Sequence, residues 1–177
     1  LLTGQRREEV AGMCWKELDL ERGLWSLTAD RTKNGQAHDV PLSDMALGIL
    51  KGLRERGGRE LIFGEGKGAF SGWSQAKMRL DRRSGVSGWR VHDFRRTVVT
   101  GMAELGVQPH IIEAAVNHLS GHRAGVAGIY YRATYATEKT NAMNRWAHHV
   151  GTVVNKNLTE TAIIQSSVKI FARTNRS

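Results

Sequence analysis

Two side chains suited to binding phosphate lie three residues apart in the most regular helical segment of the sequence. His92 and Arg95 fall within 91–105, where apolar residues recur at spacings of three and four. This pattern predicts a helix with both side chains on one face, away from the apolar stripe. Arginine donates paired hydrogen bonds to phosphate oxygens, and histidine adds another donor. By itself such a pair more often belongs to an ordinary polar helix face, so partners elsewhere in the chain must decide.

Further cations stand at two predicted turns. Arg6 and Arg7 follow Thr3-Gly4 at the start of a predicted helix, where backbone N–H groups favour an anion. Glu9 lies three residues after Arg6 and is placed to hold its guanidinium. Lys33 flanks Asn34-Gly35, a strong hairpin turn signal, so it can reach into a site from the tip of a loop. In isolation, a basic helix start is common on solvated surfaces, and a lysine on a hairpin tip more often serves solubility.

The second half of the chain adds histidines and tyrosines. Asn117-His118 ends an apolar helical stretch, where a histidine is often only a cap, and Tyr130 and Tyr131 follow a run of small residues. His118 and His122 are four apart, but Gly121 disfavours a continuous helix between them, so we expect no metal site. The glycine-rich segment 64–68 lacks the spacing of a phosphate-binding loop.

Composition narrows the class of protein. The 177 residues suit one domain, and 26 Lys+Arg against 17 Asp+Glu give a net charge of +9. Such a basic chain favours a polyanionic partner, most often nucleic acid. No apolar run approaches the ~18 residues of a membrane-spanning helix. The single cysteine, Cys14, excludes an internal disulfide framework and suits a reducing compartment.

The elements that would position these residues indicate an α+β fold, mostly helical, with a small antiparallel sheet over about 24–41. We expect a strand at 24–29 and its partner at 38–41. The expected helices are 5–13, 44–56 with Ser43 as N-cap, 73–83, 91–105, a helix from Pro109 to about 117, 124–132 and 138–149. Residues 1–150 are predicted to form one domain. Residues 151–177, polar and basic with a β-prone stretch at 168–171, are predicted to form a C-terminal tail.

Taken in order, the set matches a known pattern. The chain contains Thr-Gly-Gln-Arg6, Arg-Thr-Lys33, His92-Asp-Phe-Arg95-Arg-Thr, Asn-His118 and Ile-Tyr130. It resembles the catalytic domain of the tyrosine recombinases, the phage integrase family, over about residues 1–146. Intervening segments such as 8–12 and 40–42 are also similar to that family. Each piece is weak alone, but the ordered combination is specific.

The resemblance implies DNA cleavage and rejoining without a metal or other cofactor. Tyr130 would attack a phosphodiester, forming a 3′-phosphotyrosyl link and a free 5′-hydroxyl. Arg6 and Arg95 would clamp the non-bridging oxygens, and His92 and His118 would add hydrogen bonds, with His92 the candidate acceptor of the tyrosine proton. Lys33 would protonate the departing 5′-oxygen. Glu9 would orient an arginine.

The resemblance also implies partners and a setting. The partner would be double-stranded DNA, bound by a homo-oligomer that is expected to be a tetramer when two sites are joined. We expect a phage-encoded or bacterial protein, cytoplasmic and associated with the nucleoid, whose N-terminal DNA-binding part is missing from this chain. The segment 151–177 is expected to pack on a neighbouring protomer.

Several alternatives stay open at this stage. Arg7 competes with Arg6, although Arg6 directly follows the Thr-Gly-Gln lead. His122 and Tyr131, nine residues apart, compete with His118 and Tyr130, which are twelve apart. Two other functions also fit the pattern: a DNA-binding protein of the same fold that no longer cuts, and a type IB topoisomerase.

Overall fold

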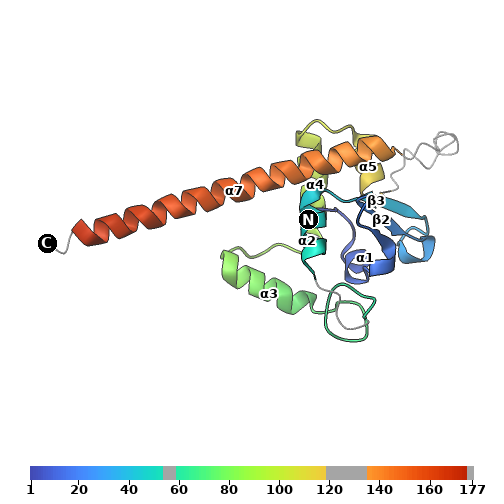
Figure 1. Cartoon of the computed structure of the whole chain (residues 1–177), viewed down its shortest axis with the longest axis horizontal. Helices are drawn as coiled ribbons and strands as arrows, with labels where there is room; N and C mark the ends of the chain where they lie inside the picture. The colour runs from blue at the N-terminus through green and yellow to red at the C-terminus, as the bar shows by residue number, and fades with distance from the viewer. Residues whose placement is uncertain (54–58, 119–134, 175–177) are drawn as a thin grey trace.

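The computed structural model describes residues 1–53, 59–118 and 135–174, with side chains as far as residue 156. Its elements are α1 (Arg7–Ala11), β1 (Leu18–Asp19), β2 (Leu24–Leu27), β3 (His38–Pro41), α2 (Asp44–Gly52), α3 (Trp73–Ser84), α4 (Asp93–Glu104), α5 (Pro109–Ala115) and α7 (Ala136–Thr174), with short 3-10 turns η1 (Trp15–Glu17) and η2 (Ala29–Arg31). Figure 1 shows the small sheet at one end of a mostly helical body. The expected fold class is confirmed.

The sheet is antiparallel, in the order β1-β2-β3, with Trp25 paired to Val40. Alternate residues of β2 point into an apolar core that α2 covers, and Trp25 and Val40 are fully buried there. The core of this sheet lobe consists of Met13, Trp25, Leu27, Val40, Leu42, Ala46, Leu50 and Ile62. The Ser43 hydroxyl accepts from the Ala46 amide and starts α2 as predicted. Strand β1 was not predicted, because two residues carry no periodic pattern.

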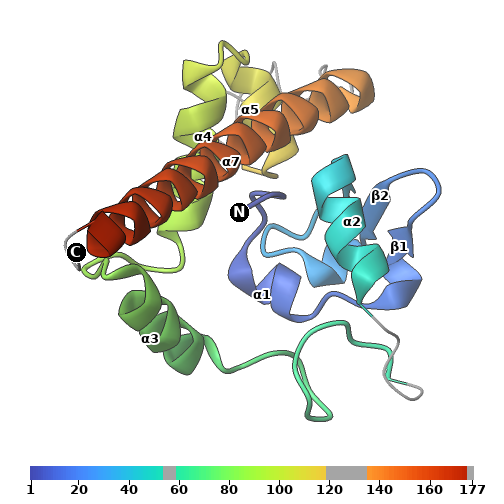
Figure 2. The ribbon, with the colours of Figure 1, turned by 60° about the vertical axis from the view of Figure 1, so that its left-hand side comes forward.

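A second core lies between α4, α5 and α7, which Figure 2 shows crossing one another beside the sheet lobe. It contains Val98, Met102, Val107, Ile111, Ile112, Ala115, Ala142, Met143 and Trp146. Val98 and Met102 are fully buried, so the predicted apolar stripe of α4 does face a core. Pro109 occupies the first turn of α5, as the sequence predicts. Gly106, just after α4, has a φ of +76°, which is typical of the glycine that ends a helix.

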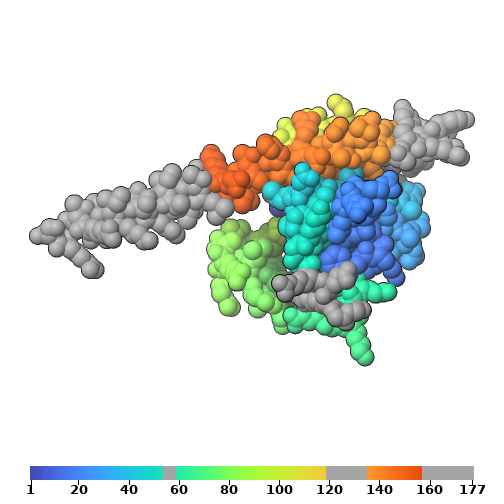
Figure 3. Space-filling model, viewed as in Figure 1, coloured from blue at the N-terminus to red at the C-terminus, as the bar shows by residue number. Residues whose placement is uncertain are grey.

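The last helix differs from prediction. Instead of a helix at 138–149 and a β-prone stretch at 168–171, the structure has one helix, α7, from Ala136 to Thr174. It runs out past the body of the molecule in Figure 1, and Figure 3 shows its described side chains lying against α2. Gly151 does not end the helix. A Cβ at this position would lie 3.0 Å from Met45 Cε, so the glycine lets α7 approach α2 closely.

A similar close approach holds α4 against α7. A Cβ added to Gly101 would lie 2.3 Å from Cζ3 of Trp146, a buried core side chain. Alanine normally favours a helix interior over glycine by about 1 kcal/mol. Here the clash should reverse that sign, and we expect Gly101→Ala to lower the free energy of unfolding by about 1–3 kcal/mol. Chemical denaturation measured by circular dichroism checks the change.

Gly48 provides the matched control. It lies within α2, and a Cβ there would meet no atom within 4 Å. Gly48→Ala should therefore raise the free energy of unfolding by about 0.5–1 kcal/mol. Equal effects of the two substitutions would contradict the proposed packing of α4 on α7.

Candidate active site

The structure brings five of the six predicted site residues to one pocket. Arg6, Lys33, His92, Arg95 and His118 line a hollow of about 700 Å³ between the hairpin loop, α4 and the end of α5. These residues span more than a hundred positions of the sequence and come from both lobes. Arg96 adds a fourth Lys or Arg side chain to the lining, against one carboxylate, Glu113. The described part of this pocket is therefore strongly cationic.

Arg6 immediately precedes α1 and is held on two sides. Its backbone N–H donates to Glu9 Oε2 at 2.8 Å, and its Nη1 donates to Glu9 Oε1 at 3.0 Å. Its Nη2 donates to the carbonyl oxygen of Asn117 at 3.1 Å. Glu9 is buried, so the predicted Arg6–Glu9 pair is a fixed support rather than a loose surface contact.

Arg7, the competing arginine, points elsewhere. It pairs with Glu8 at 2.6 Å, and its side chain is 56% exposed. Arg7 lines a smaller, adjoining hollow beside α3, which shares His92 and Arg95 with the pocket of Arg6, but Arg7 does not line that pocket itself. Of the two arginines, the geometry therefore favours Arg6.

Arg95 lines the same pocket as His92, with which the sequence predicts it to share a helix face, but its side chain is buried. Its guanidinium donates to the carbonyl oxygens of Gly4 at 2.8 Å and Val116 at 2.5 Å. Burial, and then the nearby charge of Arg6, lower the pKa of Arg95 to about 10. Arg95 thus stays charged at neutral pH, and no carboxylate forms an ion pair with it in the described ranges. An anion in the pocket would complete its environment.

Gly4 makes that arrangement possible. Its φ is +64°, a conformation that suits glycine, and an added Cβ would lie 3.0 Å from Val116 Cγ1 and 3.1 Å from Val98 Cγ1. The turn therefore needs glycine at this position, both for its backbone angle and for its packing. With the turn formed, the Gly4 carbonyl accepts from Arg95 and Arg6 follows two residues later.

His92 stands at the N-cap position of α4 rather than inside a helix that begins at Val91. The helix begins at Asp93. The carboxylate of Asp93 accepts from the Arg90 amide at 2.8 Å, and this hydrogen bond closes a turn just before the helix. His92 and His118 are both exposed along the pocket. His118 follows α5, and its amide donates to the carbonyl of Glu113 at 2.9 Å.

Lys33 is exposed on the connection between β2 and β3. This connection is longer than the tight two-residue hairpin that Asn34-Gly35 indicates, because η2 intervenes before the turn. The turn itself is present: the Gly35 amide donates to the Thr32 carbonyl, and Gly35 has a φ of +68°. Lys33 therefore sits on a loop whose tip reaches the pocket.

An ion pair between Arg31 and Glu17, which the sequence analysis did not predict, fixes the start of this loop. Arg31 in η2 donates to Glu17 Oε1 at 2.6 Å and to the backbone carbonyl of Glu9 at 3.1 Å. Burial favours the neutral form of Glu17, but hydrogen bonds from Arg31 and Trp25 outweigh it and lower the pKa of Glu17. Arg31 therefore connects the loop of Lys33 to the helix that carries Glu9. Residue spacing could not predict these contacts, because Glu17 and Glu9 are 14 and 22 residues from Arg31 in the sequence.

Tyr130, the predicted nucleophile, lies outside the described residues, as do its competitors Tyr131 and His122. Their roles stay predictions. Within the described ranges, no group of three or more His, Cys, Asp or Glu side chains is arranged to hold a metal ion. In the same ranges, no helix is long and apolar enough to cross a membrane.

The site defines a class of protein. A cluster of fixed arginines with histidines and a lysine on a loop can bind a phosphodiester and stabilise charge that develops on it. The phage integrase family matches residues 1–137 of the chain. The chain therefore belongs to the phage integrase family.

Individual relatives agree with this assignment. A prophage integrase of Escherichia coli K12, IntA, is 34% identical over 172 residues, covering 93% of this chain and 41% of the relative. A shufflon-specific DNA recombinase of Escherichia coli is 30% identical and covers 70% of this chain and 30% of the relative. The integrase of mycobacterium phage Brujita has a similar fold, with a TM-score of 0.63 at 21% identity over 82% of this chain and 48% of that protein. The chain thus spans about two fifths of the length of IntA.

Proposed function

We propose that the protein carries out site-specific DNA recombination, integration or excision, by breaking and rejoining strands through a 3′-phosphotyrosyl intermediate. The observation that carries the proposal is the convergence of Arg6, Lys33, His92, Arg95 and His118 on one cationic pocket. Membership of the phage integrase family, with relatives named as integrases and a DNA recombinase, supports it.

The proposed cleavage step is a displacement at phosphorus. The hydroxyl oxygen of Tyr130 attacks the scissile phosphorus while its proton passes to His92. The bond from phosphorus to the 5′-oxygen breaks, and Lys33 supplies the proton that this oxygen needs as it leaves. The phosphotyrosyl link retains the energy of the phosphodiester, so a 5′-hydroxyl can attack it in the reverse step without a nucleotide cofactor.

The remaining residues stabilise charge on the non-bridging oxygens. Arg6 and Arg95 would bind these oxygens, because both guanidiniums are held in place by protein oxygens before DNA arrives. His118 would donate a further hydrogen bond. Glu9 orients Arg6 and does not itself touch the phosphate in this scheme.

Trapping on nicked DNA tests the proposal. The test uses DNA duplexes that contain a randomised segment and a nick just beyond each candidate cleavage position. Cleavage releases the short fragment between the cleavage position and the nick, so rejoining fails and the protein stays attached to the DNA. Adducts that resist detergent are expected, and sequencing of the attached DNA gives the preferred site. Absence of any adduct would favour the DNA-binding protein that no longer cuts. Relaxation of a supercoiled plasmid without exchange between two sites would favour a type IB topoisomerase.

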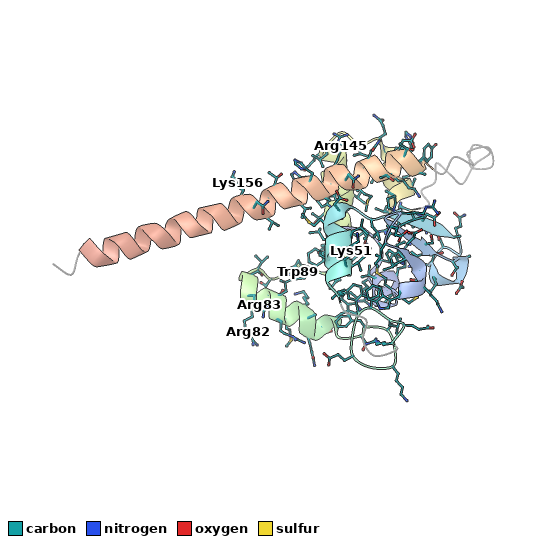
Figure 4. All side chains as sticks on the ribbon, viewed as in Figure 1. Lys51, Arg82, Arg83, Trp89, Arg145 and Lys156 are labelled. Carbon is teal, nitrogen blue, oxygen red and sulfur yellow. The ribbon has the colours of Figure 1, made fainter. Side chains whose placement is uncertain are left out.

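Binding to DNA should depend on the exposed arginines of α3. Arg79, Arg82 and Arg83 are exposed and form no ion pair in the part of the chain that the structure describes; Figure 4 shows Arg82 and Arg83 extending from this helix. If they contact phosphates, each contact releases counterions. The double variant Arg82→Ala/Arg83→Ala should therefore weaken binding and reduce the slope of log Kd against log salt concentration by about 2. Fluorescence anisotropy across a salt series measures this slope.

Lys16→Ala is the control for net charge, because Lys16 already pairs with Glu60 at 3.4 Å. It should leave the slope nearly unchanged. An affinity for DNA that does not vary between low and moderate salt would contradict a phosphate-based interface, whichever residues form it.

Assembly and setting complete the proposal. Each protomer cuts one strand, so joining two duplexes requires four protomers, and we expect a tetramer on DNA. The protein would work on DNA in the bacterial cytoplasm, at the nucleoid. Residues 1–150 would form the catalytic domain, with the end of α7 packing on a neighbouring protomer. Deletion of residues 151–177 without any change in assembly on DNA would count against this last role.

A further inference from the structure

The loop that carries Lys33 is joined to the segment that carries His118 by a pair of amides. Asn34 Nδ2 donates to Asn117 Oδ1 at 2.7 Å, and Asn117 Nδ2 donates back to Asn34 Oδ1 at 3.2 Å. The two residues are 83 positions apart and come from different lobes. Each directly adjoins a predicted site residue: Lys33 precedes Asn34, and His118 follows Asn117.

Asn117 is held in an unusual conformation to make this contact. Its φ is +51°, a region that non-glycine residues rarely adopt and that asparagine tolerates better than most. The residue is only 9% exposed. Its carbonyl oxygen accepts from Arg6 Nη2 at 3.1 Å. The backbone of Asn117 therefore binds Arg6, while its side chain binds Asn34 of the loop.

The loop of Lys33 needs such a contact. Lys33 is exposed at the tip of a connection, and a lysine side chain has about 2 kcal/mol of rotamer freedom to lose when it is fixed. Arg31 fixes the base of the connection, before the turn. On the side of the turn that faces the pocket, Asn34 makes the hydrogen bonds that cross to the other lobe.

We propose that Asn34 and Asn117 are positioning residues, which hold the loop so that the Lys33 amine meets the departing 5′-oxygen. The inference rests on the proposed function and extends it. Because displacement of a catalytic group by about 1 Å can cost about 10²-fold in rate, loss of the pair should slow cleavage by about 10- to 100-fold. The effect should fall on the protonation of the leaving group, not on the affinity for DNA.

Two single variants, their double variant and one control variant separate the pair from its surroundings. Asn34→Ala removes the amide on the loop. Asn117→Gly removes the other amide but keeps the positive φ and the carbonyl that Arg6 uses, because glycine adopts this conformation readily. If the pair acts as one unit, each single variant and the double variant should be slowed to the same extent. Gln36→Ala, an exposed change on the same loop, should cleave at the rate of the unaltered chain.

A sulfur leaving group makes the readout specific. A nicked duplex recovered from the trapping selection is prepared with either oxygen or sulfur at the bridging 5′ position. A thiol, with a pKa near 8.5, leaves as the thiolate and needs no general acid. The sulfur duplex should therefore restore cleavage by Asn34→Ala and Asn117→Gly, as it should for Lys33→Ala. It should not restore Arg95→Ala, since Arg95 is assigned to the non-bridging oxygens.

The outcomes distinguish failure of the proposed function from failure of the positioning role. If the unaltered chain attaches to neither duplex, the proposed function fails and the positioning role fails with it. If the unaltered chain cleaves but the asparagine variants match it, the positioning role alone is overturned. Slowing of the variants by the same factor on oxygen and sulfur duplexes also overturns it, because that result indicates a structural role without any link to Lys33.

Discussion

Arg95→Ala should reduce the rate of covalent attachment to nicked DNA by at least about 10²–10³-fold, the usual cost of removing one donor to a charged transition state. Arg95 is buried, yet its pKa of about 10 keeps it charged at neutral pH, and its described partners are the neutral carbonyls of Gly4 and Val116. A charge held in this way is prepared for an anion. Its loss removes stabilisation that water cannot replace inside the pocket.

Two controls keep this result interpretable. Arg95→Lys retains a cation but cannot form two parallel hydrogen bonds, so it should also be strongly impaired. Arg7→Ala, which removes an exposed arginine paired with Glu8, should have little effect. Thermal unfolding of each variant shows whether the fold survives. Normal cleavage by a folded Arg95→Ala variant, or severe loss in Arg7→Ala, would contradict the assignment of the phosphate clamp.

The sequence predicted the main elements because their signals are local. The apolar spacing of α4, the N-cap at Ser43 and the proline at the start of α5 each depend on neighbours within a few residues. The small sheet followed from two short apolar runs around a turn. The resemblance to tyrosine recombinases then ordered the scattered polar residues into one site, and the structure brings five of them to one pocket.

What the sequence did not predict depends on contacts between distant parts of the chain. Arg95 is buried against segments that are distant in the sequence, and it donates to the carbonyl oxygens of Gly4, 91 positions away, and of Val116. The Arg31–Glu17 ion pair and the Asn34–Asn117 amides likewise join segments whose proximity is a product of folding. The boundary at Gly151 was predicted from the polar, basic sequence beyond it, but α7 continues through this residue, whose missing Cβ leaves room for Met45 of α2.

Tyr130→Phe should abolish covalent attachment altogether. Phenylalanine has no oxygen to attack phosphorus, so neither a slow rate nor a longer incubation should yield an adduct. Binding to DNA should persist, because the arginines that we propose to contact phosphate are unchanged. Tyr131→Phe is the matched control: the same oxygen is removed one residue away, and attachment should remain. The opposite result would assign the nucleophile to Tyr131 and favour His122 over His118.

The central claim is that one tyrosine attacks a phosphodiester held by the cationic pocket. The most direct test digests the detergent-resistant adduct with protease and nuclease and locates the nucleotide by mass spectrometry. The account predicts a 3′-linked nucleotide on the hydroxyl oxygen of Tyr130, formed by the unaltered chain and missing from Tyr130→Phe. A nucleotide on a different residue, a link through a 5′-phosphate, or no adduct from a folded chain that binds DNA would contradict it.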